Sequence, residues 1–260
     1  MKIYVVCDIE GVAGVIDHRQ QCWFDGPYYA QARRLATLEL NALVEGALEG
    51  GATEIVAWDG HGPFPGGLDV ELLCPECRLV MGAGGGGPVG LDSSYDALFQ
   101  CGLHAMAGTA GAVMAHGGWR LNGRPLGEIG MNALTAGMRG VPCVFISGDQ
   151  AAAQEARALI SDIEVAVVKE PLFSDVAGLS PAPALSLAPE KARQVIRESA
   201  QRAMGKVGSI PALRFEPPYT LEWQFSEAQA ADEMAARPGA VRVDAKTVAF
   251  ESDDFFILPL

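Results

Sequence analysis

The sequence predicts an α/β fold, with a mostly parallel sheet covered by helices on both faces and a smaller α+β unit after it. Through the first two-thirds of the chain, short apolar runs typical of buried strands alternate with segments of helical periodicity. Strands that are apolar on both faces need helices above and below their sheet. A stretch rich in Pro, Ala and Ser then begins at residue 178. We therefore expect an α/β domain over residues 1–177 and an α+β domain over residues 178–260.

The elements of the first domain follow from apolar runs and their boundary residues. Strands are expected over residues 3–7, 54–58, 79–81, 96–101, 142–147 and 164–169, and helices over residues 28–49, 68–73, 127–138 and 150–160. Asn122-Gly123 is a strong signal for a two-residue hairpin, and Asp149 is a typical helix N-cap. In the second domain we expect helices over residues 190–204 and 227–236, with strands over residues 219–225 and 241–250.

The composition indicates a globular protein and excludes several partners. A formal charge of -13 argues against nucleic acids and anionic membranes, because no basic surface would neutralise their phosphates. No segment approaches the ~18 apolar residues of a membrane span. The N-terminus leads directly into a strand without the apolar segment of a signal peptide, so we expect a cytoplasmic protein. Its six cysteines are then expected to be reduced, including the pair Cys74 and Cys77.

Polar residues capable of binding metal follow three of the predicted strands. The first strand leads into Asp8-Ile9-Glu10-Gly11, in which the carboxylates are two residues apart and the glycine permits a sharp turn or close approach to a ligand. The second strand leads to His61 and the strand over residues 96–101 to His104. Because ligands bind outside the carboxyl ends of parallel strands, we expect these four side chains to gather there. Buried carboxylates are costly unless a cation or hydrogen bonds satisfy them, so the sequence predicts a metal site.

Two further residues are candidates for the same site. Glu128 begins a predicted helix, where a carboxylate alone would serve only to complement the helix dipole. His116 lies among small residues in Met114-Ala115-His116, where a histidine that merely fills a turn is the common case. His18, between Asp17 and Arg19, is expected on the surface.

Imidazole and carboxylate ligands without clustered thiolates suit zinc or manganese. Three carboxylates and two imidazoles exceed the needs of one tetrahedral zinc ion and suit two ions that share a bridging carboxylate. Such a pair can activate a water molecule and polarise a carbonyl or phosphoryl group.

The chain resembles the D-aminopeptidases of the dipeptide-transport operon type, a family of dinuclear zinc peptidases. Order and spacing agree over roughly residues 1–170, and the set of motifs is specific although no single one is. The matching motifs are Asp8-Ile9-Glu10-Gly11, His61, Gly102-Leu103-His104-Ala105, Met114-Ala115-His116, Asn122-Gly123-Arg124-Pro125-Leu126-Gly127-Glu128-Ile129-Gly130-Met131-Asn132-Ala133 and Ser147-Gly148-Asp149.

The resemblance implies a role for each candidate residue. It implies two zinc ions per chain, and a zinc-activated water that removes N-terminal D-amino acids from short peptides. It also implies a ring-like homo-oligomer that encloses the active sites, with a decamer as one candidate size. His116 would be a catalytic residue beside the metals, and the implied zinc ligands are Asp8, Glu10, His61, His104 and Glu128.

Two other functions stay open from the residues alone. The same ligand types serve two-metal phosphoesterases, although Arg120 and Arg124 are the only basic residues near the ligand segments. A binding protein in which the metal only stabilises the fold is the non-enzymatic alternative. Metal content and a panel of aminoacyl and phosphoryl substrates separate the three.

Overall fold

The computed structural model describes residues 1–62, 64–82, 87–173 and 181–259. Its larger sheet has the strand order β3-β2-β1-β4-β7-β8-β9, in which only β9 pairs antiparallel with its neighbour. Chain order therefore reverses between β1 and β4, the kind of switch point beside which α/β proteins bind ligands. The strands are β1 (Lys2–Cys7), β2 (Glu54–Asp59), β3 (Cys77–Val80), β4 (Ala97–Leu103), β7 (Cys143–Asp149), β8 (Glu164–Pro171) and β9 (Ala184–Ser186).

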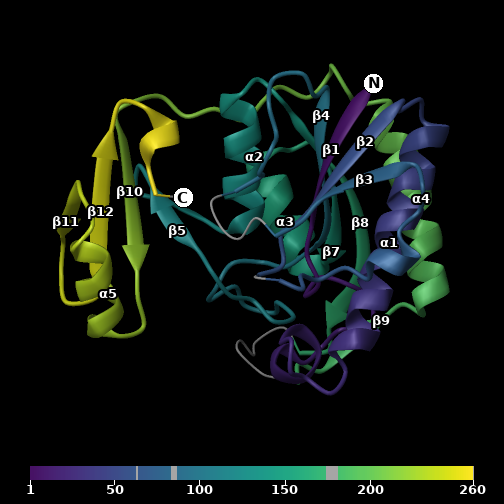
Figure 1. Ribbon diagram of the computed structural model, residues 1–260, viewed down its shortest axis with the longest axis horizontal. Coiled ribbons are helices and arrows are strands. Elements are labelled where there is room, and N and C mark those ends of the chain that lie inside the picture. Colours follow the sequence, from purple (N-terminus) through teal and green to yellow (C-terminus); the bar gives the residue numbers. More distant parts are fainter. Residues whose placement is uncertain (63, 83–86, 174–180, 260) are drawn as a thin grey trace.

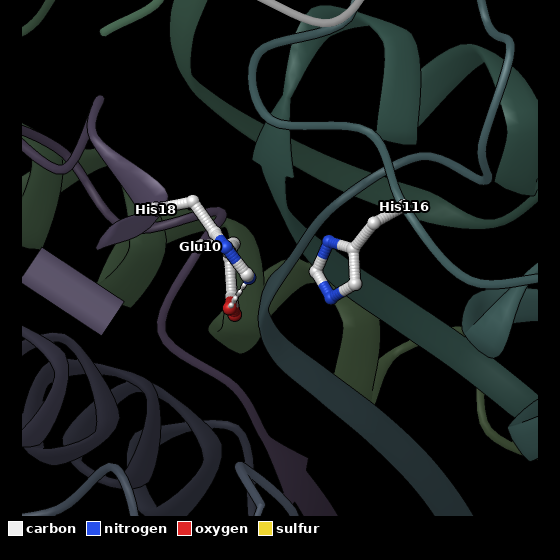
Figure 2. A group of neighbouring side chains, drawn as sticks. All are labelled: Glu10, His18 and His116. Atoms are coloured by element: carbon white, nitrogen blue, oxygen red, sulfur yellow. Dashed lines mark ion pairs between the residues drawn. The ribbon is translucent and has the colours of Figure 1, made fainter. Parts of the chain in front are cut away.

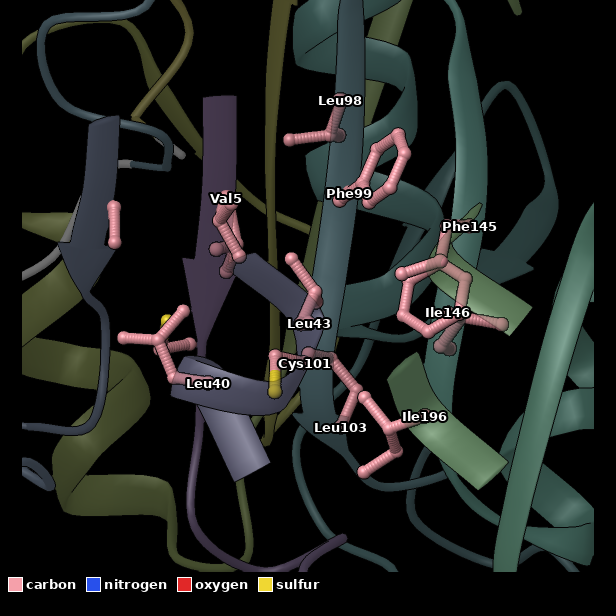
Figure 3. Close-up of a cluster of buried hydrophobic side chains, with 14 of the residues drawn as sticks. Val5, Leu40, Leu43, Leu98, Phe99, Cys101, Leu103, Phe145, Ile146 and Ile196 are labelled. Atoms are coloured by element: carbon pink, nitrogen blue, oxygen red, sulfur yellow. The ribbon is translucent and has the colours of Figure 1, made fainter. Parts of the chain in front are cut away.

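Helices cover both faces of this sheet, as the sequence predicts (Figure 1). Helices α1 (Tyr29–Glu49) and α4 (Pro189–Met204) pack together on one face, and α2 (Glu128–Met138) and α3 (Gln150–Leu159) lie on the other. The core is built from strand residues such as Phe99 and Phe145, whose rings lie 5.3 Å apart, and from helix residues such as Leu40, Leu43 and Ile196 (Figure 3). Burying each such side chain contributes about 1.5–3 kcal/mol, so the sheet provides a rigid base for the loops at its edges.

A smaller antiparallel sheet has the strand order β11-β12-β10-β5-β6. Its strands are β5 (Trp119–Leu121), β6 (Arg124–Leu126), β10 (Tyr219–Gln224), β11 (Ala240–Arg242) and β12 (Thr247–Ser252), accompanied by helix α5 (Ala228–Ala235). The β5–β6 turn has positive φ at Asn122 and Gly123, which confirms the predicted hairpin. Helix α2 contributes to both cores, with Ala133 in the larger one and Leu134 in the smaller one.

The chain does not divide between the sheets in sequence order. Strand β9 and helix α4 come after the expected boundary between residues 177 and 178, yet they belong to the larger sheet and its core. The hairpin β5–β6 comes long before that boundary and pairs with β10. The boundary itself lies outside the described residues, and the division into two domains stays a prediction.

Two local predictions also differ from the structure. The strand expected over residues 241–250 was wrong, since that stretch forms two strands, β11 and β12, that pair antiparallel with each other. The helix expected over residues 68–73 is a single 3-10 turn, Val70–Leu72, because Asp69 accepts a hydrogen bond from Glu71 N at its start and the backbone is already extended at Leu73. Within the described ranges, no helix combines the length and apolar composition that crossing a membrane requires.

Candidate metal centre

The five expected ligand residues lie together at the carboxyl edge of the larger sheet. Asp8 and Glu10 follow β1, His61 follows β2 and His104 follows β4, while Glu128 is the first residue of α2. Strand β1 ends at Cys7, so the two carboxylates lie in the loop after it, not on the strand. The order of β1, β2 and β4 within the sheet is what brings their loops together.

Asp8 stands between the two imidazoles. Its Oδ1 lies 3.1 Å from His61 Nδ1, and its Oδ2 lies 3.4 Å from His104 Nε2. His61 Nδ1 is also 3.3 Å from Glu10 Oε2, and His104 Nε2 is also 3.6 Å from Glu128 Oε1. The cluster therefore consists of two carboxylate–imidazole groups that share one aspartate.

Backbone carbonyls fix the tautomers of three histidines. His61 Nε2 hydrogen-bonds to Cys22 O at 2.7 Å, His104 Nδ1 to Ala105 O at 2.9 Å, and His116 Nδ1 to Met114 O at 3.0 Å. A carbonyl oxygen only accepts, so the bonded nitrogen must carry the proton, and the other ring nitrogen of the neutral imidazole carries a lone pair. This arrangement is typical of metal-binding histidines.

His18 has the other tautomeric arrangement, with its lone pair on Nδ1. The Trp23 indole Nε1–H donates to His18 Nδ1 at 3.2 Å, so the proton of a neutral His18 is on Nε2. That nitrogen lies 3.6 Å from Glu10 Oε1. His18 thus presents a donor to the cluster, where a metal ligand would present a lone pair. Figure 2 shows the His18 and His116 rings approaching from different loops, with the dashed line joining His18 to Glu10.

Burial and the close spacing of the charges shift the pKa values of the carboxylates and imidazoles in the cluster. It raises the pKa of Asp8 to about 6, and the neighbouring Glu10 carboxylate adds to the rise. Burial opposes ionisation of Glu10 as well, but the charge of His61 outweighs it and holds the pKa of Glu10 well below its usual range. Burial alone would lower the pKa of both imidazoles, yet the carboxylates around them raise it to about 12 for His61 and about 10 for His104. In the absence of other cations, the carboxylates therefore draw protons onto the imidazoles.

His116 lies over the cluster on the loop between β4 and β5. Its ring stacks on that of His104, with centroids 3.8 Å apart and planes at 17°. Met114, two residues earlier, has a φ of 63°, a left-handed conformation that is uncommon for a side chain of its size and that directs the following residues. His116 and His104 each offer a ligand atom within 4.8 Å of one on Glu128.

The loop that carries Glu10 is held by buried contacts. A Cβ on Gly11 would overlap the backbone of Gly102 and Leu103, so the close approach that this glycine permits is to β4, not to a ligand. Lys169 on β8, 2% exposed, donates from Nζ to the carbonyl oxygens of Glu10, Val12 and Val15. Such contacts restrict the motion of the Glu10 loop.

A buried acid also supports this loop. Glu39 on α1, 2% exposed, accepts a hydrogen bond from Ala13 N at 2.9 Å. Neither Lys169 nor Glu39 stands out in the sequence, because each occupies an ordinary position on a strand or helix and its partners come from a distant loop.

Two cavities meet at the cluster and share Asp8, Gly60, Gly62 and Glu128. One, of about 360 Å³, has His18, His61 and His116 in its wall and the exposed rings of Trp23 and Phe24 at its rim. The rest of its wall consists of Glu10, Cys22, Tyr29, Gly60 and Gly62. The other cavity, of about 300 Å³, extends along α2 on a different side of Asp8 and Glu128.

Comparison with known proteins fits this geometry. The family model described as D-aminopeptidase matches residues 1–258. The chain belongs to the D-aminopeptidase family. A D-aminopeptidase of Bacillus subtilis (strain 168) is 32% identical over 266 residues, which cover 98% of this chain and 92% of the relative. The solved structure of the Zn-dependent D-aminopeptidase DppA from Bacillus subtilis, described as a self-compartmentalizing protease, matches with a TM-score of 0.87 at 29% identity, over 98% of this chain and 93% of DppA.

The residues of this family member fit a metal ion on chemical grounds. Among the described residues, Glu10 Oε2 and His104 Nε2 are fully buried and have no hydrogen-bond partner. A lone pair facing a carboxylate oxygen is repulsive unless a proton or a cation lies between them. Carboxylate oxygens and imidazole nitrogens are common zinc ligands. His18 is partly exposed, as expected, but it also lines the cavity beside Glu10, a role that the sequence does not indicate because the single π-helical turn His18–Cys22 carries no apolar periodicity.

Proposed function

We propose that this protein is a zinc-dependent aminopeptidase that removes N-terminal D-amino acids from short peptides. The observation that carries the proposal is the buried cluster around Asp8, in which the lone-pair nitrogens of His61 and His104 face the carboxylates at 3.1–3.6 Å. Membership of the D-aminopeptidase family supplies the reaction, and the Zn-dependent structural neighbour supplies the metal.

The number of ligands supports two zinc ions per chain. Asp8 directs Oδ1 toward His61 and Oδ2 toward His104, so it suits a bridging ligand. Glu10 and His61 would complete one site, and Glu128 and His104 the other. When bound, such a pair polarises the scissile carbonyl and lowers the pKa of a water molecule. His18 is outside this set because its donor nitrogen faces Glu10.

His116 is proposed as the catalytic residue of the chain itself. The carbonyl of Met114 holds its Nδ1, and stacking on His104 fixes the plane of its ring. The lone pair on its Nε2 can then receive the proton of the attacking water; once protonated, Nε2 can donate to the developing oxyanion and pass the proton to the leaving amine. Either role needs a fixed ring beside the cluster, as the stacking provides.

A ring-like homo-oligomer that encloses the active sites is also part of the proposal, with a decamer as one candidate size. The structural neighbour DppA is a self-compartmentalizing protease, which supports an assembly of this kind. Exposed apolar side chains on the smaller sheet and after it support a further contact surface, namely Val241, Val243 and Ile257, which are 57%, 56% and 72% exposed. Measurement of the mass in solution tests the assembly separately from the chemistry.

The decisive experiment compares hydrolysis of D-alanyl and L-alanyl p-nitroanilides by the protein as purified, after exhaustive chelation, and after zinc is returned. We expect the D substrate to be favoured, activity to disappear with the metal, and zinc to restore it. A phosphate-ester substrate serves as the control for the alternative reaction. Full hydrolysis after chelation, or a preference for the L substrate, would contradict the proposal.

A further inference from the structure

The cavity of about 300 Å³ along α2 is aromatic, adjacent to the cluster and less open than the cavity of about 360 Å³. Asp8 and Glu128 form one wall, and the apolar part includes Trp58, Met131 and Trp223. Trp58 is 5% and Met131 6% exposed, whereas Trp23 and Phe24 at the rim of the other cavity are 47% and 67% exposed. An aminopeptidase must hold one residue on one side of the scissile bond and release a peptide on the other. The less open, aromatic cavity suits the single residue, and the more open one suits the departing peptide.

The cavity along α2 is larger than a small side chain needs. Its volume of about 300 Å³ is twice the roughly 150 Å³ that is sufficient to hold a benzene ring in a protein interior. Glu128 and Thr135 both line it and are seven residues apart on α2, which places them about 10 Å apart along the helix axis. Thr135 therefore marks the end remote from the cluster. A methyl group would leave most of this space unfilled.

Hydrogen bonds fix the orientation of one amide side chain in the cavity lining, that of Asn132. Gln100, completely buried on β4, donates from Nε2 to Ile129 O at 3.1 Å, so its Oε1 must face Asn132. Asn132 Nδ2 donates to that oxygen at 3.3 Å, which leaves the carbonyl oxygen Oδ1 as the remaining polar atom of its side chain. Asn132 lies one turn after Glu128 and lines the cavity. A mostly apolar pocket with a few placed polar groups is the usual form of a small-molecule site, and an amide carbonyl oxygen can accept a hydrogen bond from an amine.

We propose that this cavity binds the N-terminal residue of the substrate and selects large apolar, above all aromatic, side chains, while Asn132 Oδ1 accepts a hydrogen bond from the free amine. This inference rests on the proposed aminopeptidase function and adds a substrate class to it. Among the described residues that line the cavity, none is a lysine or arginine, and the only acids belong to the wall at the cluster. An acidic side chain would find no cation among these residues, and a basic one would find no acid at the remote end.

The test measures kcat/KM for D-phenylalanyl, D-leucyl, D-alanyl, D-lysyl and D-glutamyl p-nitroanilides on the zinc-loaded protein. We expect D-phenylalanyl to exceed D-alanyl by at least about tenfold, the lower end of what one additional apolar group contributes in such a pocket. The variant Thr135→Leu, which fills the remote end, should lower the Phe/Ala ratio by about tenfold or more. Thr220→Leu on β10, outside the cavity lining, is the matched control and should leave that ratio unchanged.

A binding measurement separates failure of this inference from failure of the proposed function. Three of the four tryptophans, Trp58, Trp119 and Trp223, line the cavity, so the intrinsic fluorescence of the protein reports on its occupancy. D-phenylalanine should change this fluorescence with a Kd at least tenfold below that of D-alanine, whether or not any substrate is hydrolysed. Equal Kd values would overturn the inference, as would a D-alanyl preference in kcat/KM. Absence of all hydrolysis with tight D-phenylalanine binding would instead reject only the aminopeptidase reaction.

Discussion

The larger and smaller sheets contribute different things to the site. Four of the five expected ligands lie on loops that follow buried strands of the larger sheet, the fifth, Glu128, begins α2, and Lys169 and Glu39 hold the loop of Glu10 in place. The smaller sheet contributes the aromatic side chains Trp119 and Trp223 to the cavity wall. The proposed chemistry therefore lies at the edge of the parallel sheet, whereas the cavity wall is built jointly by that sheet, by α2 and by the two rings of the smaller sheet. Changes at the cluster should then alter turnover, and changes in the cavity wall should alter selectivity.

The largest effect is expected from His104→Ala. His104 Nε2 is buried between Asp8 and Glu128 without a hydrogen-bond partner, so its removal should lower the zinc content and reduce kcat by about 10³-fold or more. Zinc per chain is measured by mass spectrometry on protein of known concentration. An unchanged zinc content in a folded His104→Ala variant would exclude His104 as a ligand.

A smaller loss of activity is expected from His116→Ala. Unlike the loss in His104→Ala, it should occur without loss of zinc. His116 stacks on His104 and is not needed to complete either proposed metal site, so the variant should retain both ions and its fold. Its kcat should fall by about 10²-fold, the usual scale for a positioned acid, base or oxyanion donor. Turnover at the parental rate would remove His116 from the mechanism, and loss of one ion would make it a ligand.

Glu39→Gln should change how stability responds to pH. Burial raises the pKa of Glu39 to about 7, above the ordinary value of 4.5, so the folded state binds more protons than the unfolded state between these values. The free energy of unfolding therefore falls as pH rises through this range, and Glu39 accounts for about 2 kcal/mol of the fall between pH 5 and pH 8. In chemical denaturation experiments, the free energy of unfolding of the variant should therefore fall less between pH 5 and pH 8 than that of the parent. Glu227→Gln, at an exposed position, is the control, and equal pH dependence in the two variants would contradict this explanation of Glu39.

The smallest effect is expected from replacing both Cys74 and Cys77 with serine. Both thiols are free, and neither belongs to the clusters that could hold a metal among the described residues. Zinc content and kcat should stay within about twofold of the parent, because two thiols without further partners do not form a closed tetrahedral site. Loss of one zinc ion per chain in the double variant would show that the pair binds metal.

Local pattern was sufficient for much of the fold and for part of the site. Asp8, His61 and His104 were predicted to lie together because each follows an apolar strand, and the carboxyl ends of parallel strands share one edge. Glu128 and His116 were assigned through resemblance to a family, since their local sequence is equally compatible with a helix start and a turn. The positions of all five expected ligands agree with that resemblance, while their roles as zinc ligands stay predictions.

The remaining features depend on contacts between distant segments. The amphipathic pattern of α4 does not predict which sheet the helix covers. In the structure, α4 packs beside α1 on the larger sheet. Trp119 and Trp223 come together because β5 pairs with β10 across about a hundred residues, which periodicity does not encode. His18 was missed for the same reason, because its importance lies in its proximity to Glu10 and His116.

Titration of the metal-free protein with zinc is the sharpest test of a two-metal site built around Asp8. Bound zinc and the rate of D-alanyl p-nitroanilide hydrolysis are followed together as zinc is added to protein that has been exhaustively chelated. Because Asp8 faces both His61 and His104, we expect bound zinc to reach a plateau at two ions per chain and full activity to require both. A plateau at one ion per chain with full activity, or full activity before any zinc is added, would contradict the two-metal site.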